Sequence, residues 1–143
     1  MRTRKLHFVL HGIAVLTVLA LAGFSASGEV EEHHARGELV PVEGSSVGGQ
    51  VNLVQLPQGG TLISVVASGL KPGGTYVSLY YSNHDCGFDA LDMGIVGGTY
   101  TPDGTVGHVV GRIDDDLDEV NSISVRNADD LSLLACADVH PAD

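Results

Sequence analysis

The chain has 143 residues, with seven Lys and Arg against 18 Asp and Glu, and a formal net charge of −11 at neutral pH. Nucleic acids and anionic membrane surfaces would be repelled by such a surface, whereas a cationic protein or divalent metal ions would not. The sequence has no Trp and no glycine-rich phosphate loop between a strand and a helix, which removes many enzyme classes from consideration.

The first 28 residues have the order of a secretory signal. Arg2, Arg4 and Lys5 precede an uncharged apolar run over 6–22, and small residues follow at 25–28. We expect residues 1–28 to be removed and the protein to be secreted or periplasmic; an uncleaved run would instead anchor it in a membrane. The mature chain would keep four basic residues against 18 acidic ones, a net charge of −14.

The rest of the chain reads as one all-β domain. Residues 29–37 have no apolar periodicity and are predicted to be a flexible acidic leader. Short runs rich in Val, Ile, Leu, Thr and Tyr then alternate with Gly, Pro, Asn and Asp. The expected strands are 38–43, 48–56, 61–69, 75–81, 95–100, 105–113, 122–127 and 131–138. Eight strands with brief connections predict an antiparallel Greek-key sandwich or flattened barrel over 38–143.

Alternation within these strands assigns their faces. In the fourth strand we expect Val77 and Leu79 to face the core. The hydroxyl-bearing residues that alternate with them, Tyr76, Ser78 and Tyr80, are expected to face a loop or solvent. The full set predicted to point inward is Val65, Val77, Leu79, Val109 and Val125.

Cys86 and Cys136 are the two cysteines of the sequence. An exported chain with two thiols most often pairs them, so we predict a disulfide whose Cα atoms lie about 4.4–6.8 Å apart. Closing a loop of roughly 50 residues would stabilise the fold by about 4 kcal/mol.

Several segments in a fixed order carry a resemblance to a known family. They are Val42-Glu43-Gly44, the run 47–53, Gly69-Leu70-Lys71-Pro72-Gly73, Asp92-Met93-Gly94, Pro102-Asp103-Gly104, Ala128-Asp129-Asp130-Leu131 and Leu134-Ala135-Cys136. In order and spacing they are similar to segments of the copper/zinc superoxide dismutase family, over nearly the whole mature chain. The resemblance implies that family's β-sandwich, and it places both cysteines where the family has its disulfide.

The copper ligands that the resemblance implies are not retained. The family's His-x-His pair aligns with Ser78 and Tyr80, neither of which is a usual copper ligand, and its later copper histidine aligns near Arg126. A guanidinium stays protonated and cannot replace an imidazole. If the alignment holds, Ser78, Tyr80 and Arg126 should cluster as a polar plug, with Arg126 bonded to Tyr80 or Asp129.

Zinc ligands are also poorly represented. Asp92 aligns with the family's zinc aspartate, Asp89 falls near a zinc histidine position, and His84 lies close by in the sequence, so these three form an alternative metal set. The acidic run formed by Asp114, Asp115, Asp116, Asp118 and Glu119 offers oxygens to calcium but lacks the spacing of the loop calcium motif, and we expect a solvated turn.

The sequence therefore predicts a non-catalytic structural or binding module without a cofactor. The alternatives are a copper- and zinc-containing dismutase with rearranged ligands, and a secreted metal or small-ligand binder that uses Tyr76, Tyr80 and Tyr81. An edge strand could also mediate a homodimer.

Overall fold

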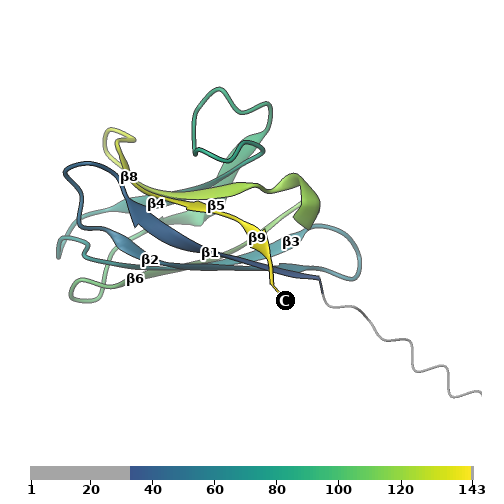
Figure 1. Ribbon diagram of the computed structural model, residues 1–143. Coiled ribbons are helices and arrows are strands. Elements are labelled where there is room, and N and C mark those ends of the chain that lie inside the picture. The colour runs from purple at the N-terminus through teal and green to yellow at the C-terminus, as the bar shows by residue number, and fades with distance from the viewer. Residues whose placement is uncertain (1–32, 143) are drawn as a thin grey trace, which may run out of the picture. The chain divides into compact units, whose positions relative to one another are not determined.

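The computed structural model describes residues 33–142, which form an all-β domain of antiparallel strands (Figure 1). The strands are β1 (His34–Pro41), β2 (Gly48–Gln55), β3 (Thr61–Ser68), β4 (Tyr76–Tyr81), β5 (Met93–Tyr100), β6 (Gly107–Ile113), β7 (Ser122–Asn127), β8 (Leu133–Asp138) and β9 (His140–Pro141). A single 3₁₀ turn, η1 (Leu117–Glu119), lies between β6 and β7 within this part of the chain. The eight expected strands are confirmed, with shifts at their ends. The predicted signal, residues 1–28, lies outside the described residues.

The strands form two layers that share one continuous order. One layer is β1-β2-β3-β6 and the other is β5-β4-β7-β8; they are joined where the end of β1 pairs with β8 (Figure 1). β5 and β6 share no ladder, but they lie side by side. Their backbones approach so closely that a methyl group on Gly111 would clash with the backbone nitrogen of Gly97. The sheet is therefore nearly closed, as in a flattened barrel.

The main core lies between the two layers. Strict alternation in β3 and β6 buries every second side chain, since successive residues of a strand point to opposite faces. Three of the residues expected inside, Val65, Val109 and Val125, belong to this core, where Val65 and Val125 are fully buried. Their predicted orientation is confirmed.

The prediction for β4 was wrong about which face meets the core. Val77 and Leu79 are buried, but in a second cluster with Tyr81 and Cys86. Ser78 is buried on the opposite face, where its hydroxyl lies 2.9 Å from the Tyr100 hydroxyl, and Tyr76 belongs to the main core on that face. Both faces of β4 are covered because the segment that follows it folds back over the outer one, so alternation alone could not identify the core side.

The predicted leader was also too long. β1 begins at His34, so the last four residues of the segment 29–37 belong to a strand. It pairs with β2 from the His34–Val54 partners onward. Ala35 is buried there, but a single alanine is too weakly apolar to show a strand pattern. Residues 29–32 lie outside the described residues.

Within residues 33–142, no helix has the length and apolarity needed to cross a bilayer.

Candidate functional site

The candidate site lies on the outer face of β4 and β7, beneath the segment 82–92 that connects β4 to β5. Cys86 in this segment is bonded to Cys136 of β8, with Cα atoms 6.0 Å apart, so the predicted disulfide is confirmed. Ser122 at the start of β7 donates to the Asn83 carbonyl at 2.7 Å and accepts from the Cys86 amide at 3.2 Å. The disulfide and these hydrogen bonds fix the segment over the two strands.

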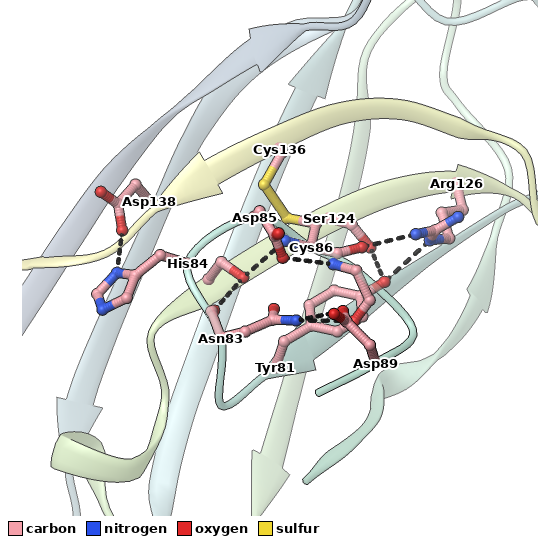
Figure 2. Close-up of a disulfide and its surroundings, with 12 residues drawn as sticks. Tyr81, Asn83, His84, Asp85, Cys86, Asp89, Ser124, Arg126, Cys136 and Asp138 are labelled. Carbon is pink, nitrogen blue, oxygen red and sulfur yellow. Dashed lines mark hydrogen bonds and ion pairs between the residues drawn. A yellow bond between two sulfur atoms is a disulfide. The ribbon is translucent and has the colours of Figure 1, made fainter. Parts of the chain in front are cut away.

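Arg126 of β7 occupies the space between the strands and this segment. It is 6% exposed, and its Nε donates to the Tyr81 hydroxyl at 2.9 Å. Its two terminal nitrogens donate to the carbonyls of Leu131 and Cys86, each at 2.7 Å. Figure 2 shows the guanidinium directed toward Tyr81 and the Cys86 segment, with Ser124 beside them. We call Arg126, Tyr81, Ser124, Cys86 and Leu131 the Arg126 cluster. The hydrogen bonds of the guanidinium in this cluster all go to neutral acceptors.

Stacking completes the environment of the guanidinium. The Phe88 ring centroid lies 3.9 Å from Cζ of Arg126, and Phe88 is 53% exposed. No ion pair among residues 33–142 includes Arg126. A buried cation that has carbonyl dipoles and an aromatic face, but no carboxylate, is a structural element held by several weak partners.

The two carbonyls that Arg126 binds belong to unusual backbone positions. Among the described residues, Cys86 and Leu131 are the non-glycine residues with positive φ, at 56° and 60°. Such a conformation is unfavourable for residues with a Cβ and persists where its surroundings enforce it. Arg126 is therefore the side chain that ties together the two strained turns, one on each side of the site.

The expected cluster of Ser78, Tyr80 and Arg126 does not form. In the antiparallel ladder of β4 and β7, Arg126 lies opposite Val77 and Ser78 lies opposite Val125. Directly opposed residues share a face, so Arg126 lies with Val77 and Tyr81, while Ser78 and Tyr80 point the other way. Tyr81, and neither Tyr80 nor Asp129, is the partner of Arg126.

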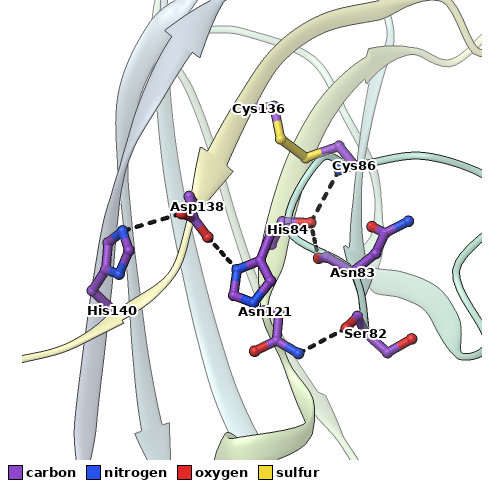
Figure 3. Close-up of polar contacts among 9 residues, drawn as sticks. Ser82, Asn83, His84, Cys86, Asn121, Cys136, Asp138 and His140 are labelled. Carbon is purple, nitrogen blue, oxygen red and sulfur yellow. Dashed lines mark hydrogen bonds and ion pairs between the residues drawn. A yellow bond between two sulfur atoms is a disulfide. The ribbon is translucent and has the colours of Figure 1, made fainter.

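The alternative metal set of His84, Asp89 and Asp92 is also dispersed. His84 Nδ1 lies 2.6 Å from Oδ1 of Asp138, whose Oδ2 lies 3.2 Å from Nε2 of His140 (Figure 3). The Asp89 carboxylate accepts a hydrogen bond from the side-chain amide of Asn83 at 3.1 Å. Within the described residues, no group of three or more His, Cys, Asp or Glu side chains is arranged to hold a metal ion.

Tyr80 and Asp92 lie in a separate acidic patch. The pKa of Tyr80 is raised by burial, by its hydrogen bond with Asp115, and by the negative charges around it. The pKa of Asp92 is raised by its hydrogen bond with Asp115 and by the charge of that carboxylate. Two carboxyl groups this close favour sharing a proton.

We expect Asp92→Asn to raise the melting temperature at about pH 7 and to have little effect at about pH 3. The folded state binds the Asp92 proton more tightly than the unfolded state, because the pKa of Asp92 is raised on folding. Stability is therefore lost as the pH rises through this pKa, and the neutral amide avoids that loss. Melting curves across this range check it. Asp103→Asn, in the turn before β6, is the matched control, and an equal gain from both changes would contradict the assignment.

The acidic run around η1 has a structural use. Asp116 Oδ1 accepts from the Gly60 backbone amide at 2.9 Å and from the Gln55 side chain at 2.7 Å, and these hydrogen bonds lower the pKa of Asp116. Glu119 accepts from the Asp116 amide at 2.9 Å. These contacts join the run to the hairpin between β2 and β3.

A small-ligand site made from Tyr76, Tyr80 and Tyr81 would need an exposed aromatic patch. Tyr76 is 5% exposed, Tyr81 is fully buried, and the two lie on opposite faces of β4. The three rings therefore do not form one surface.

Sequence reasoning missed Tyr81, Ser124, Phe88 and Leu131 as parts of the site. The available signal was the alternation of Val77, Leu79 and Tyr81, which places Tyr81 on the apolar side of β4. A tyrosine at the end of an apolar row needs a partner for its hydroxyl, and Ser124 and Arg126 supply it.

No family model matches this chain, and no curated protein matches it.

Proposed function

We propose that this chain is an exported domain with the scaffold of the copper/zinc superoxide dismutase family, that it lacks a copper site, and that it acts as a non-catalytic structural or binding module. The strand order supports the scaffold. Strands β4, β5 and β6 follow one another in space, and β7 returns to lie beside β4, which is the order of a Greek key. The disulfide between the β4–β5 segment and β8 is a second point in favour.

The single observation that carries the non-catalytic assignment is that Ser78, Tyr80 and Arg126, the three positions aligned with copper ligands, offer no imidazole and do not share one face of β4 and β7. Copper in proteins is held by imidazole, thiolate or thioether groups, and the Arg126 cluster offers two hydroxyls and two carbonyls instead. The guanidinium has no lone pair for a metal, and its positive charge opposes the entry of a cation. The scaffold can persist without its chemistry because function depends on side chains placed upon it.

Metal analysis and a superoxide assay test this proposal. The exported protein, purified from cells grown with added copper and zinc, should lose its copper on dialysis and show dismutase activity no higher than that of its dialysis buffer. Stoichiometric copper that survives dialysis, with an activity that a chelator abolishes, would instead establish the dismutase with rearranged ligands.

A further inference from the structure

A cavity opens at the end of the barrel where β1 begins. β8 pairs with β1 through Val40 and Pro41, at the C-terminal end of β1, so the ladder that joins the two layers stops well before the start of that strand. The chain then returns as β9, which pairs with β1 at Ala35 and Arg36. A cavity of about 590 Å³ lies between these strands and η1. The mouths of β-barrels are common places for small-molecule sites, whose volumes are typically about 300–1,000 Å³.

Apolar side chains line the inner part of this cavity. Ala35, Val120 and Val139 are buried and belong to the main core. Leu117 of η1 packs against the same core, and Pro141 of β9 also contributes to the lining. This part of the cavity can therefore shield the apolar body of a small ligand from water.

The side-chain amides of the lining are engaged within the protein. Gln55 Nε2 donates to the Gly60 carbonyl at 3.1 Å and to Oδ1 of Asp116 at 2.7 Å. The side-chain amide of Asn121 donates to the Ser82 carbonyl at 2.7 Å (Figure 3). A ligand in the cavity therefore meets carboxylate acceptors more readily than amide donors.

The lining is negatively charged. It includes two carboxylates, Asp116 and Asp118, together with His33 and His34, but no Lys or Arg. The hydrogen bonds from Gly60 and Gln55 lower the pKa of Asp116, so this carboxylate stays ionised at neutral pH. The excess of acidic residues over the whole chain adds to the attraction for a positively charged ligand.

We propose that this cavity, which we call the amine site, binds a small organic cation. The apolar body of the ligand lies against Leu117, Val120 and Val139, and its ammonium group lies at Asp116 and Asp118. The ammonium supplies the donors that the carboxylates require, and hydrogen bonds between two charged groups are stronger than those between neutral groups. A neutral compound of the same shape loses these contacts, and an anion is repelled.

The amine site shares no residue with the Arg126 cluster. The inference therefore does not depend on the proposed loss of copper chemistry. Its test measures neither copper content nor dismutase activity, so the two proposals can fail separately.

Three indole compounds that differ in charge test the amine site on the purified exported protein. Tryptamine carries an ammonium group, tryptophol a neutral hydroxyl and indole-3-propionate a carboxylate. The chain has no Trp, so indole fluorescence excited beyond the tyrosine absorption band reports the probe alone. We expect tryptamine to bind with a dissociation constant of about 0.1–1 mM, tryptophol to bind about tenfold more weakly, and indole-3-propionate to show no saturable binding. Tryptamine binding should weaken between about 50 and 500 mM NaCl.

Two pairs of variants separate the charged and apolar parts of the site. Asp118→Asn should weaken tryptamine binding about threefold but leave tryptophol binding unchanged. Asp114→Asn removes the same charge from the same acidic run outside the cavity, and it should have less than about half of that effect. Leu117→Ala should weaken both compounds about threefold, whereas Leu131→Ala, at an exposed leucine outside the cavity, should weaken neither. Melting curves with the disulfide intact establish that each variant is folded.

Amide chemical shifts locate the binding. Tryptamine should move the signals of Gln55, Leu117 and Asn121 and leave those of the turn at Asp103 and Gly104 in place. The absence of saturable shifts up to about 10 mM tryptamine would overturn the proposal. So would tryptophol binding as tightly as tryptamine, or equal losses from Asp118→Asn and Asp114→Asn, which would indicate a general attraction of cations to an acidic protein.

Discussion

We expect Arg126→Met to lower the free energy of unfolding by about 3 kcal/mol. This loss is equivalent to about 10 °C in melting temperature for a domain of this size. Methionine replaces the aliphatic stem but donates no hydrogen bond. The carbonyls of Cys86 and Leu131 are then left without the donors that reach them at 2.7 Å. The Cys86 carbonyl lies in a buried contact, where an acceptor without a partner costs about 1–3 kcal/mol, and the Leu131 carbonyl, in a part-buried contact, adds less. Tyr81 keeps its contact with Ser124 and contributes less to the loss.

Denaturant unfolding with the disulfide intact measures this effect. Arg112→Met, at an exposed arginine of β6, is the matched control and should change stability by no more than about 0.5 kcal/mol. Arg126→Lys should fall between wild type and Arg126→Met, because an ammonium keeps the charge but cannot reach three acceptors in the guanidinium's fork. Equal losses from Arg126→Met and Arg112→Met would contradict the role given to the Arg126 cluster.

The strands were predictable because their signal is local. β3 and β6 bury every second residue, and glycine-containing turns bound β3 on both sides and precede β6. The start of β1 and the whole of β9 were not predictable in this way. Both exist through pairing with a distant strand, as in the Arg36–His140 partners, and a two-residue strand has no periodicity of its own.

The site was harder to predict because both faces of β4 are buried. A change of one residue in register exchanges the two faces of a strand. The resemblance placed Ser78 and Tyr80 beside Arg126, whereas the ladder places Val77 opposite Arg126 and the Tyr81 hydroxyl accepts its Nε hydrogen bond. Alternation had correctly separated the two rows, but it could not show that the 82–92 segment covers the apolar one. The turns at Cys86 and Leu131 could not be predicted from the sequence either, since neither residue type favours positive φ.

The disulfide and Arg126 should be energetically coupled, because both hold the segment of Cys86. Replacing Cys86 and Cys136 together by alanine opens a link of sequence separation 50 and should cost about 4 kcal/mol, a large part of the 5–15 kcal/mol typical of a domain. Alanine is the suitable replacement because Cys86 is 1% exposed, and a serine hydroxyl there would need a new partner.

In the disulfide-free background we expect Arg126→Met to cost at least about 1 kcal/mol less than in the wild-type background. A segment no longer fixed by the disulfide can move so that the Cys86 carbonyl reaches water, and the loss of its donor then leaves no buried acceptor. Guanidinium unfolding of the four proteins of this cycle gives the coupling free energy directly. Ser64→Ala, on the opposite layer at β3, supplies the reference pair with the cysteine change and should be additive within about 0.5 kcal/mol. Additive effects of Arg126→Met and the cysteine change would mean that the two groups hold different parts of the molecule.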